Sequence, residues 1–266
     1  MIDLRRNNVH VTGQGSRTIV FAHGFGCDQN MWRFIVPAFE SDYRIVLFDY
    51  VGHGKSDASA YDRARYHSLQ GYAEDVLAIC GALGIRNGVF VGHSVSAMIG
   101  ILAAKAEPGR FDALVLIGPS PCYLNQDGYT GGFSREDIEG LLEFLDANHL
   151  GWSSQMAPII MGNPERQELT TELTNSFCRT DPQIARDFAR VTFLSDNRGD
   201  LAQVRVPCLI LQCSKDVIAG EQVGRYVHQH IPGSEFALLN ATGHCPHLSA
   251  PAETIAAIRS FLARSS

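Results

Sequence analysis

Short apolar runs recur along the chain, and each has the length of a buried strand. They cover residues 17–22, 44–48, 88–91 and 113–117, and two more follow much later in the chain at 207–212 and 235–239. The first four are rich in β-branched and aromatic residues and are bounded by Gly, Asp or Pro, as expected of strands buried on both faces of a parallel sheet.

Helical spacing fills the intervals between these runs. Apolar residues recur from Leu69 to Leu83 and stop at Gly84, which fits a helix C-cap. Further helices are expected just after the run 88–91, near 220–231 and over 251–263. This alternation of strands and helices predicts an α/β fold with a mostly parallel, doubly wound sheet.

The alternation of predicted strands and helices is interrupted between residues 120 and 200, where helical patterns continue without a convincing strand. Ser134 and Asp137 have the spacing of a capping box that opens a helix, and Pro158, Pro164 and Pro182 punctuate the rest of this segment. We therefore expect a single domain, with a core of about 1–119 and 201–266 and a helical lid of about 120–200.

The segment Gly92-His-Ser94-Val-Ser96 follows a predicted strand and precedes a predicted helix. This is the context of a nucleophile elbow, in which a sharp turn lifts a serine hydroxyl clear of the sheet. The usual pattern G-x-S-x-G is broken, because its last glycine is Ser96. The context still predicts Ser94 as the nucleophile.

A nucleophilic serine needs a base and a carboxylate that orients the base, in the chain order Ser, acid, His for this architecture. Asp216 follows the run 207–212 and His244 follows the run 235–239. Upstream, a Gly-rich turn contains Phe25, and its N–H together with that of Val95 could bind an oxyanion.

Other residues compete for these roles. Spacing alone does not exclude His247 as the base, whereas His93 is expected to be a surface or packing residue. Asp196 and Asp200 lie in the helical insertion, where we expect solvated or capping carboxylates. No group of His, Cys, Asp or Glu has metal-ligand spacing, so neither a metal nor a cofactor is expected.

The composition further narrows the classes of protein to which this chain could belong. The chain has 266 residues with 22 Lys and Arg against 28 Asp and Glu, a formal net charge of −6, which gives no electrostatic footprint for nucleic acid or an anionic membrane. No apolar run is long enough to span a bilayer, and the first residues lack the apolar core of a signal peptide. Seven scattered cysteines are expected to be free core thiols, with Cys27 and Cys245 beside the motifs above. We expect a cytoplasmic protein.

Several longer strings resemble one group of α/β-hydrolases, which contains the bacterial stress-signalling hydrolase RsbQ and the plant karrikin and strigolactone receptors. These strings cover residues 23–29, 49–56, 92–97, 120–125, 131–133 and 243–247. The resemblance implies the α/β-hydrolase fold, a triad of Ser94, Asp216 and His244, and a four-helix lid over an apolar pocket. It also implies candidate pocket-lining residues, which are Phe25, Phe133, Trp152, Phe193 and Ile218.

Three functions fit these observations. The first is a cofactor-free serine hydrolase that acts on a small, fairly apolar ester or lactone. The second, motivated by the resemblance alone, is a ligand-sensing module that binds or slowly cleaves a small molecule and recruits a protein partner through its lid. The third is another serine-triad chemistry on the same fold, such as C–C bond hydrolysis, perhydrolysis or a lyase reaction.

Overall fold

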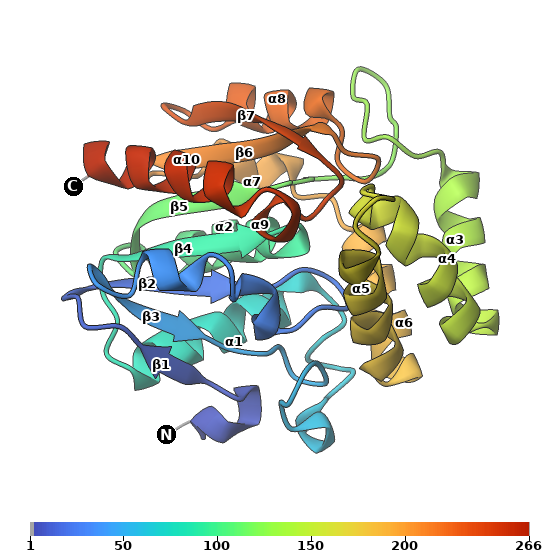
Figure 1. The fold of residues 1–266 in the computed structure, drawn as a ribbon, viewed down its shortest axis with the longest axis horizontal. Coiled ribbons are helices and arrows are strands. Elements are labelled where there is room, and N and C mark those ends of the chain that lie inside the picture. Colours follow the sequence, from blue (N-terminus) through green and yellow to red (C-terminus); the bar gives the residue numbers. More distant parts are fainter. Residues whose placement is uncertain (1–2, 266) are drawn as a thin grey trace.

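The computed structural model describes residues 3–265, which form a seven-stranded sheet with helices on both faces and at one end (Figure 1). The strand order is β1-β3-β2-β4-β5-β6-β7, and every neighbouring pair is parallel except β1 with β3. The strands are β1 (His10–Thr12), β2 (Arg17–Ala22), β3 (Tyr43–Leu47), β4 (Gly88–His93), β5 (Phe111–Ile117), β6 (Cys208–Lys215) and β7 (Glu235–Thr242).

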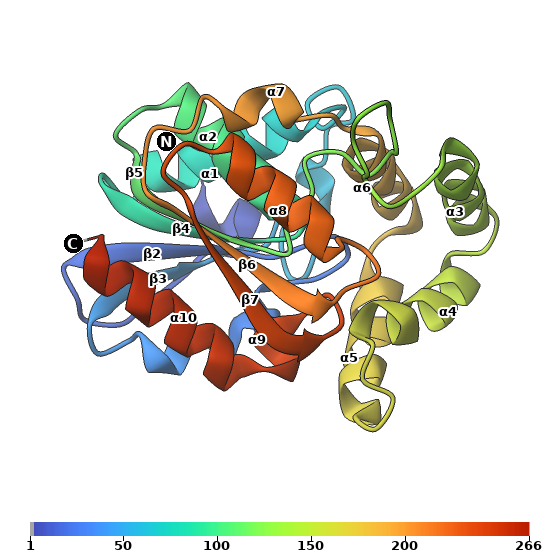
Figure 2. The same cartoon turned by 90° about the horizontal axis from the view of Figure 1, so that it is seen from above.

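The helices cover the two faces of the sheet unequally. Figure 2 shows α1 (Leu69–Ala82), α2 (Val95–Ala106) and α8 (Glu221–His230) on one face and α10 (Pro251–Arg264) on the other. The shorter helices are α7 (Arg198–Leu201), α9 (Pro246–Ser249) and the 3-10 turns Leu4–Asn7, Gln29–Trp32, Val36–Ala38 and Ala58–Ala60.

Burial on both faces explains why the strands read as continuous apolar runs. Along β2, Val20 packs into the cluster under α1 and α2, whereas its neighbours Ile19 and Phe21 pack into the cluster on the α10 side. Successive side chains of a strand point to opposite faces, so both sets must be apolar when both faces are covered. All six predicted strands are present. The antiparallel edge strand β1 carries no such run and was not predicted.

Four consecutive helices lie together beyond the carboxyl ends of the parallel strands (Figure 1). They are α3 (Arg135–Ala147), α4 (His149–Met161), α5 (Gln167–Arg179) and α6 (Pro182–Leu194), and we call them the inserted helices. The predicted capping box is present, since the Ser134 hydroxyl accepts from the Asp137 N–H and the Asp137 carboxylate accepts from the Ser134 N–H. One expectation was wrong: Pro158 does not end a helix but lies inside α4.

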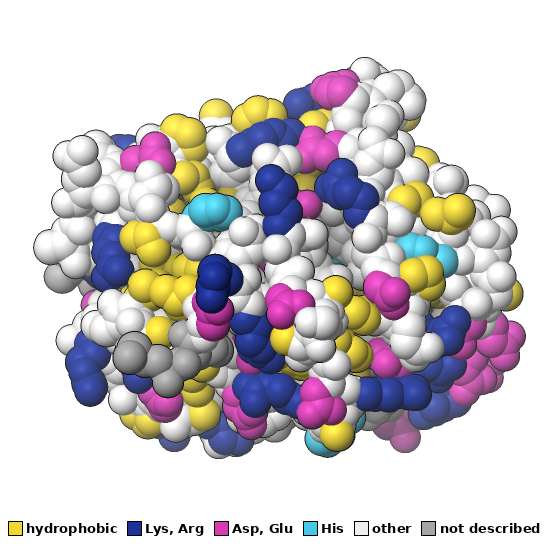
Figure 3. Space-filling model, turned by 90° about the horizontal axis from the view of Figure 1, so that it is seen from below, with side chains coloured by type: hydrophobic (Ala, Val, Ile, Leu, Met, Phe, Trp, Pro, Cys, Tyr) yellow, Lys and Arg dark blue, Asp and Glu magenta, His cyan; other side chains and the backbone are white. Residues whose placement is uncertain are grey.

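The surface carries no single dominant charge on the face that Figure 3 shows, where Lys and Arg side chains alternate with Asp and Glu. Elsewhere on the surface, charged side chains form exposed ion pairs, such as Arg264 with Glu235. Within residues 3–265, no helix is long and apolar enough to cross a membrane.

Candidate active site

Ser94 occupies the sharp turn between β4 and α2. Its backbone has φ 57° and ψ −125°, a conformation that costs energy for any residue with a side chain and that persists because the surroundings enforce it. The Ser94 N–H donates to the Ile117 carbonyl at 2.8 Å. At Gly92 a Cβ atom would lie 2.5 Å from the Ser96 carbonyl oxygen, so only glycine allows the turn to close this tightly. The predicted elbow geometry is present.

Two hydrogen bonds connect Ser94 to a buried carboxylate. His244 Nε2 lies 2.8 Å from Ser94 Oγ, and His244 Nδ1 lies 2.7 Å from Asp216 Oδ2. The other oxygen, Oδ1, accepts from the N–H groups of Ile218 at 2.8 Å and Ala219 at 3.1 Å. These bonds fix the carboxylate, which in turn orients the imidazole ring.

Two segments, β6 and α4, hold the His244 loop in place. The Gly243 N–H donates to the Lys215 carbonyl at 2.7 Å, and the His244 N–H donates to the Ile160 carbonyl in α4 at 2.8 Å. At Gly243, where φ is +87°, a Cβ would lie 1.9 Å from the Met161 carbonyl oxygen. The loop therefore depends on a glycine and is joined directly to the inserted helices.

The competing residues lie elsewhere. His247 is fully buried against the Trp32 ring, with centroids 4.7 Å apart, and the hydrogen bond to Ser94 comes from His244. Asp196 pairs with Arg198, and Asp200 pairs with Lys105. The alternatives that spacing left open are thus separated by the fold.

The Gly-rich turn after β2 passes close to the elbow. At Gly24 a Cβ would lie 2.7 Å from His93 Nδ1 and 3.1 Å from Ser94 Cβ. Within residues 3–265 the Phe25 N–H donates no hydrogen bond. Val95 is the first residue of α2, where an N–H has no partner inside the helix. Both donors named by the sequence are therefore available beside Ser94.

Ser96, the residue that breaks the usual elbow pattern, ties the two halves of this site together. Its hydroxyl donates to the His23 carbonyl at 2.5 Å and lies 2.7 Å from the Tyr50 hydroxyl. All three groups are buried. Because His23 directly precedes Gly24, this hydroxyl positions the turn that carries the Phe25 N–H. The sequence showed the departure from the pattern but not this role.

Replacing Ser96 by Ala is expected to lower the free energy of unfolding by roughly 1–3 kcal/mol, because the His23 carbonyl and the Tyr50 hydroxyl lose a buried partner. Urea unfolding measures the loss. Ser153→Ala is the matched control, since that hydroxyl is also buried but bonds only to the carbonyl of His149 in its own helix. Equal stability of the two variants would contradict the role given to Ser96.

A cavity opens above Ser94 between the sheet and the inserted helices. Phe25, Trp152, Phe193 and Ile218 line it as expected, whereas Phe133 does not and instead packs against Tyr123. The other lining residues, which the sequence pattern did not assign, include Cys27, Tyr123, Leu141, Met156, Ile160, Leu173, Phe177, Thr192 and Cys245. Tyr123 follows β5 at the carboxyl edge of the sheet, where sites of such folds gather, and this signal could have found it.

The cavity is apolar and tight. Aromatic rings surround Phe25, whose centroid lies 5.9 Å from that of Trp152 and 6.2 Å from that of Phe193. Only about 30 Å³ is open to a water-sized molecule, against roughly 300–1,000 Å³ for pockets that hold drug-sized ligands. A ligand larger than a few atoms therefore enters only if side chains or inserted helices move.

Four buried histidines make stability dependent on pH. Burial lowers the pKa of His53 and of His247 to about 3, and it also lowers the pKa of His23 and of His93. In the unfolded chain these rings titrate near pH 6.5. Below that pH the unfolded state therefore binds more protons than the folded state, and the folded state loses stability.

For His53 and for His247, the free energy of unfolding is expected to fall by about 1.4 kcal/mol per pH unit and per ring as the pH drops from about 6.5 toward 4. Urea unfolding at several pH values measures this slope. His247→Gln should reduce the slope by about one proton, with His10→Gln, which changes an exposed ring, as the control. A constant free energy of unfolding between pH 7 and 5 would contradict this account.

A family model, several relatives and a solved structure that match this chain agree in naming hydrolases or esterases. A family model described as "Alpha/beta hydrolase family" matches residues 19–258. The chain is 41% identical to a protein of Oryza sativa subsp. japonica that is named as a probable esterase, over 92% of this chain and 91% of that one. It is 40% identical to the strigolactone esterase of Arabidopsis thaliana, over 97% and 96%. A solved hydrolase from Oleispira antarctica superposes with a TM-score of 0.95 at 43% identity, covering 98% and 96% of the two chains.

Proposed function

Because this chain belongs to the alpha/beta hydrolase family, we propose that it is a cofactor-free serine hydrolase that cleaves a small, fairly apolar ester or lactone. The observation that carries the proposal is the pair of hydrogen bonds from Asp216 through His244 to Ser94 at the wall of an apolar cavity. The relatives named as esterases support the same class of reaction.

In the first step, His244 Nε2 takes the hydroxyl proton as Ser94 Oγ attacks the carbonyl carbon. Asp216 accepts the Nδ1–H of His244, which keeps Nε2 free as the base and stabilises the imidazolium that forms. The imidazolium then protonates the leaving alcohol oxygen, and the acyl group stays on Ser94. Water then attacks the acyl carbon with His244 again acting as the base. The bond between the acyl group and Ser94 Oγ breaks, the imidazolium returns its proton to Ser94, and the acid leaves.

The developing oxyanion needs donors that are already in place. We assign this role to the N–H groups of Phe25 and Val95, which lie on either side of Ser94 in the turn and at the start of α2. Fixed donors in a dry site stabilise charge that develops in the transition state without having to reorganise. The N-terminus of α2 adds the favourable end of a helix dipole.

The chemistry of the cavity supports a mostly apolar substrate with a second acceptor group. Most of the lining residues are aliphatic or carry large aromatic rings. Two residues of the lining, Trp152 and Thr192, carry a buried donor, Nε1 and Oγ1, that has no hydrogen-bond partner within residues 3–265. A ligand oxygen away from the reacting carbonyl would satisfy one of them, since an unpaired buried donor costs free energy.

A substrate panel tests this proposal. Purified protein is assayed with p-nitrophenyl esters of increasing acyl length, with lactones and with diketones, which report the competing C–C bond hydrolysis. We expect turnover of short esters and lactones and a steep loss with long acyl chains, because the cavity is tight. Turnover of diketones alone would overturn the ester and lactone assignment.

A second function has its own structural support. The inserted helix α4 holds the His244 loop through the Ile160 carbonyl. Just after this helix, Asn163 Nδ2 donates to the Thr242 carbonyl at 2.8 Å. A ligand that displaces α4 would therefore move the catalytic loop and change the outer surface together. Relatives include "Karrikin insensitive 2 receptor IA" of Petunia hybrida, 39% identical over 93% of this chain and 90% of that one.

Ligand-dependent capture of a protein partner from the native cell tests the sensing function. Wild type and Ser94→Ala serve as baits, with and without a ligand that the panel identifies. We expect a partner only in the presence of ligand. Captured proteins that are identical in every sample would contradict a sensing role.

A further inference from the structure

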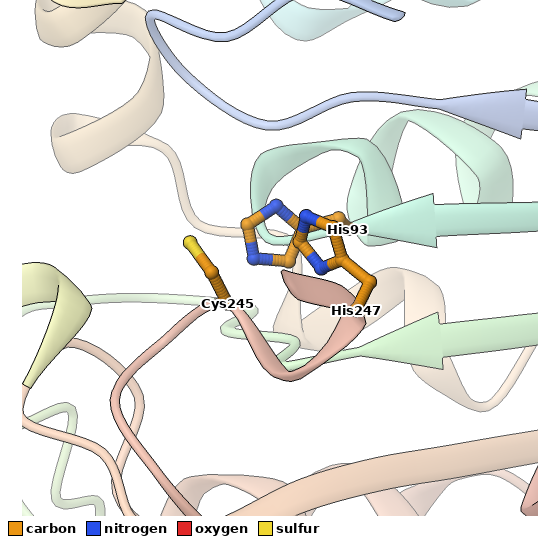
Figure 4. Close-up of side chains that lie close together, drawn as sticks. All are labelled: His93, Cys245 and His247. Carbon is orange, nitrogen blue, oxygen red and sulfur yellow. The ribbon is translucent and has the colours of Figure 1, made fainter. Parts of the chain in front are cut away.

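Three buried side chains, His93, Cys245 and His247, lie close together (Figure 4). His93 ends β4, Cys245 follows β7 and His247 lies in α9. One ring nitrogen of each histidine and the thiol sulfur lie within 4.8 Å of one another. Within residues 3–265, this is the one group of three or more His, Cys, Asp or Glu side chains with such spacing.

Polar atoms of this cluster lack partners. Neither ring nitrogen of His247 has a hydrogen-bond partner within residues 3–265, nor does Nδ1 of His93. Both side chains are at least 98% buried, with exposures of 2% for His93 and 0% for His247. Buried polar groups are normally paired, so three unpaired nitrogens in one place call for a ligand.

The tautomer of His93 leaves a lone pair on Nδ1, the ring nitrogen without a hydrogen-bond partner among residues 3–265. Its Nε2 lies 2.7 Å from the His244 carbonyl oxygen, an acceptor, so Nε2 carries the proton. A metal-bound histidine typically donates its other N–H to a carboxylate or a backbone carbonyl, and His93 already makes this contact.

We propose that His93, Cys245 and His247 bind one Zn²⁺ ion through Nδ1, a thiolate sulfur and an imidazole nitrogen. Two imidazoles and a thiolate are a donor set that suits Zn²⁺. Tetrahedral ligands at zinc lie roughly 3.3–3.6 Å apart, so the three atoms need to approach by about 1 Å. On binding, the Cys245 thiol releases its proton to water, and a water molecule takes the fourth position.

The surroundings allow an ion to reach and occupy this place. His93 and Cys245 also line the active-site cavity, whose free volume of about 30 Å³ is enough for an ion with a water molecule. Arg33, whose charge acts on His247, is paired with Glu172 through two hydrogen bonds of 2.5 Å.

The ion would act on catalysis through the residue next to it. Cys245 adjoins His244, and His93 holds the His244 carbonyl. Drawing both ligands toward an ion shifts the loop that places His244 Nε2 against Ser94 Oγ. Zn²⁺ is thus an inhibitor of the hydrolase, a consequence that rests on the proposed function, whereas the binding itself does not.

Co²⁺ serves as the spectroscopic probe, because a thiolate bound to it gives a charge-transfer band and a tetrahedral site gives intense visible bands. We expect one ion per chain in wild type, displaced by Zn²⁺. Cys245→Ser should abolish the thiolate band, and His247→Gln should weaken affinity by roughly 100-fold or more. Cys178→Ser, which changes a partly exposed thiol in α5, is the matched control and should bind as wild type does.

X-ray absorption of the Zn²⁺-loaded wild type keeps the test valid if a variant does not fold. We expect one sulfur at about 2.3 Å and two nitrogens at about 2.0 Å. A shell of nitrogen and oxygen only would place the ion at the catalytic residues and overturn the proposal, as would the absence of binding. Loss of esterase activity on adding Zn²⁺ to wild type but not to Cys245→Ser tests the inhibition separately.

Discussion

Ser94→Ala is expected to lower kcat for p-nitrophenyl acetate by about 10⁴-fold or more, because no covalent acyl-enzyme can form. The substitution removes only the Ser94 hydroxyl oxygen, which lies 2.8 Å from His244 Nε2. The backbone of the elbow stays the same, so the oxyanion donors and the cavity remain in place. Any residual rate reports their contribution alone.

Ser120→Ala is the matched control for this variant. Ser120 is also buried near the carboxyl end of the sheet, but its hydroxyl donates to the Cys122 carbonyl at 3.1 Å and does not line the cavity. Its kcat should stay within about twofold of wild type, as for a substitution away from the reacting groups. A folded Ser94→Ala protein that retained even a tenth of the wild-type rate would exclude Ser94 as the nucleophile.

Asp216→Asn is expected to lower kcat by about 10³–10⁴-fold while the fold is retained. The amide has one preferred orientation, because the oxygen that replaces Oδ1 must accept from the N–H groups of Ile218 and Ala219. The NH₂ group then faces His244 Nδ1 and donates to it. This forces the proton onto Nε2, which can no longer accept the proton of Ser94.

Asp196→Asn provides the control for Asp216→Asn. Asp196 was a competing carboxylate in the sequence, and in the structure it pairs with Arg198 on the surface. Steady-state kinetics should show no change beyond about twofold in this variant. Equal losses in both variants would mean that the effect comes from charge or stability and not from orientation of the imidazole.

The sequence was sufficient for those parts of the site that depend directly on the order of the strands. Ser94, Asp216 and His244 each come just after a buried strand, and parallel strands deliver their carboxyl ends to one edge of the sheet. These strands could be predicted because burial on both faces of the sheet makes each of them a short, continuous apolar run in the sequence. The capping box at Ser134 was equally local and was confirmed.

Features that depend on tertiary contacts could not be predicted in this way. The hydrogen bond between Ser96 and Tyr50 joins residues that are 46 positions apart in the sequence, and the one between His93 and His244 joins residues 151 positions apart. The group formed by His93, Cys245 and His247 was missed because one ligand lies far from the other two in the chain. The sequence pattern could not show whether Phe133 lines the cavity either, since an aromatic residue packs equally well beside a cavity or behind its wall.

The most direct test of the account is to trap the acyl-enzyme. Protein is mixed with p-nitrophenyl acetate, quenched in acid within the first turnover and digested for peptide mass spectrometry. The account predicts a burst of p-nitrophenol equal to the enzyme concentration and a single acetyl group on Ser94, both absent in Ser94→Ala. Turnover without any adduct, or an acetyl group on Cys27, Cys245 or another side chain that forms at the rate of the burst, would contradict it.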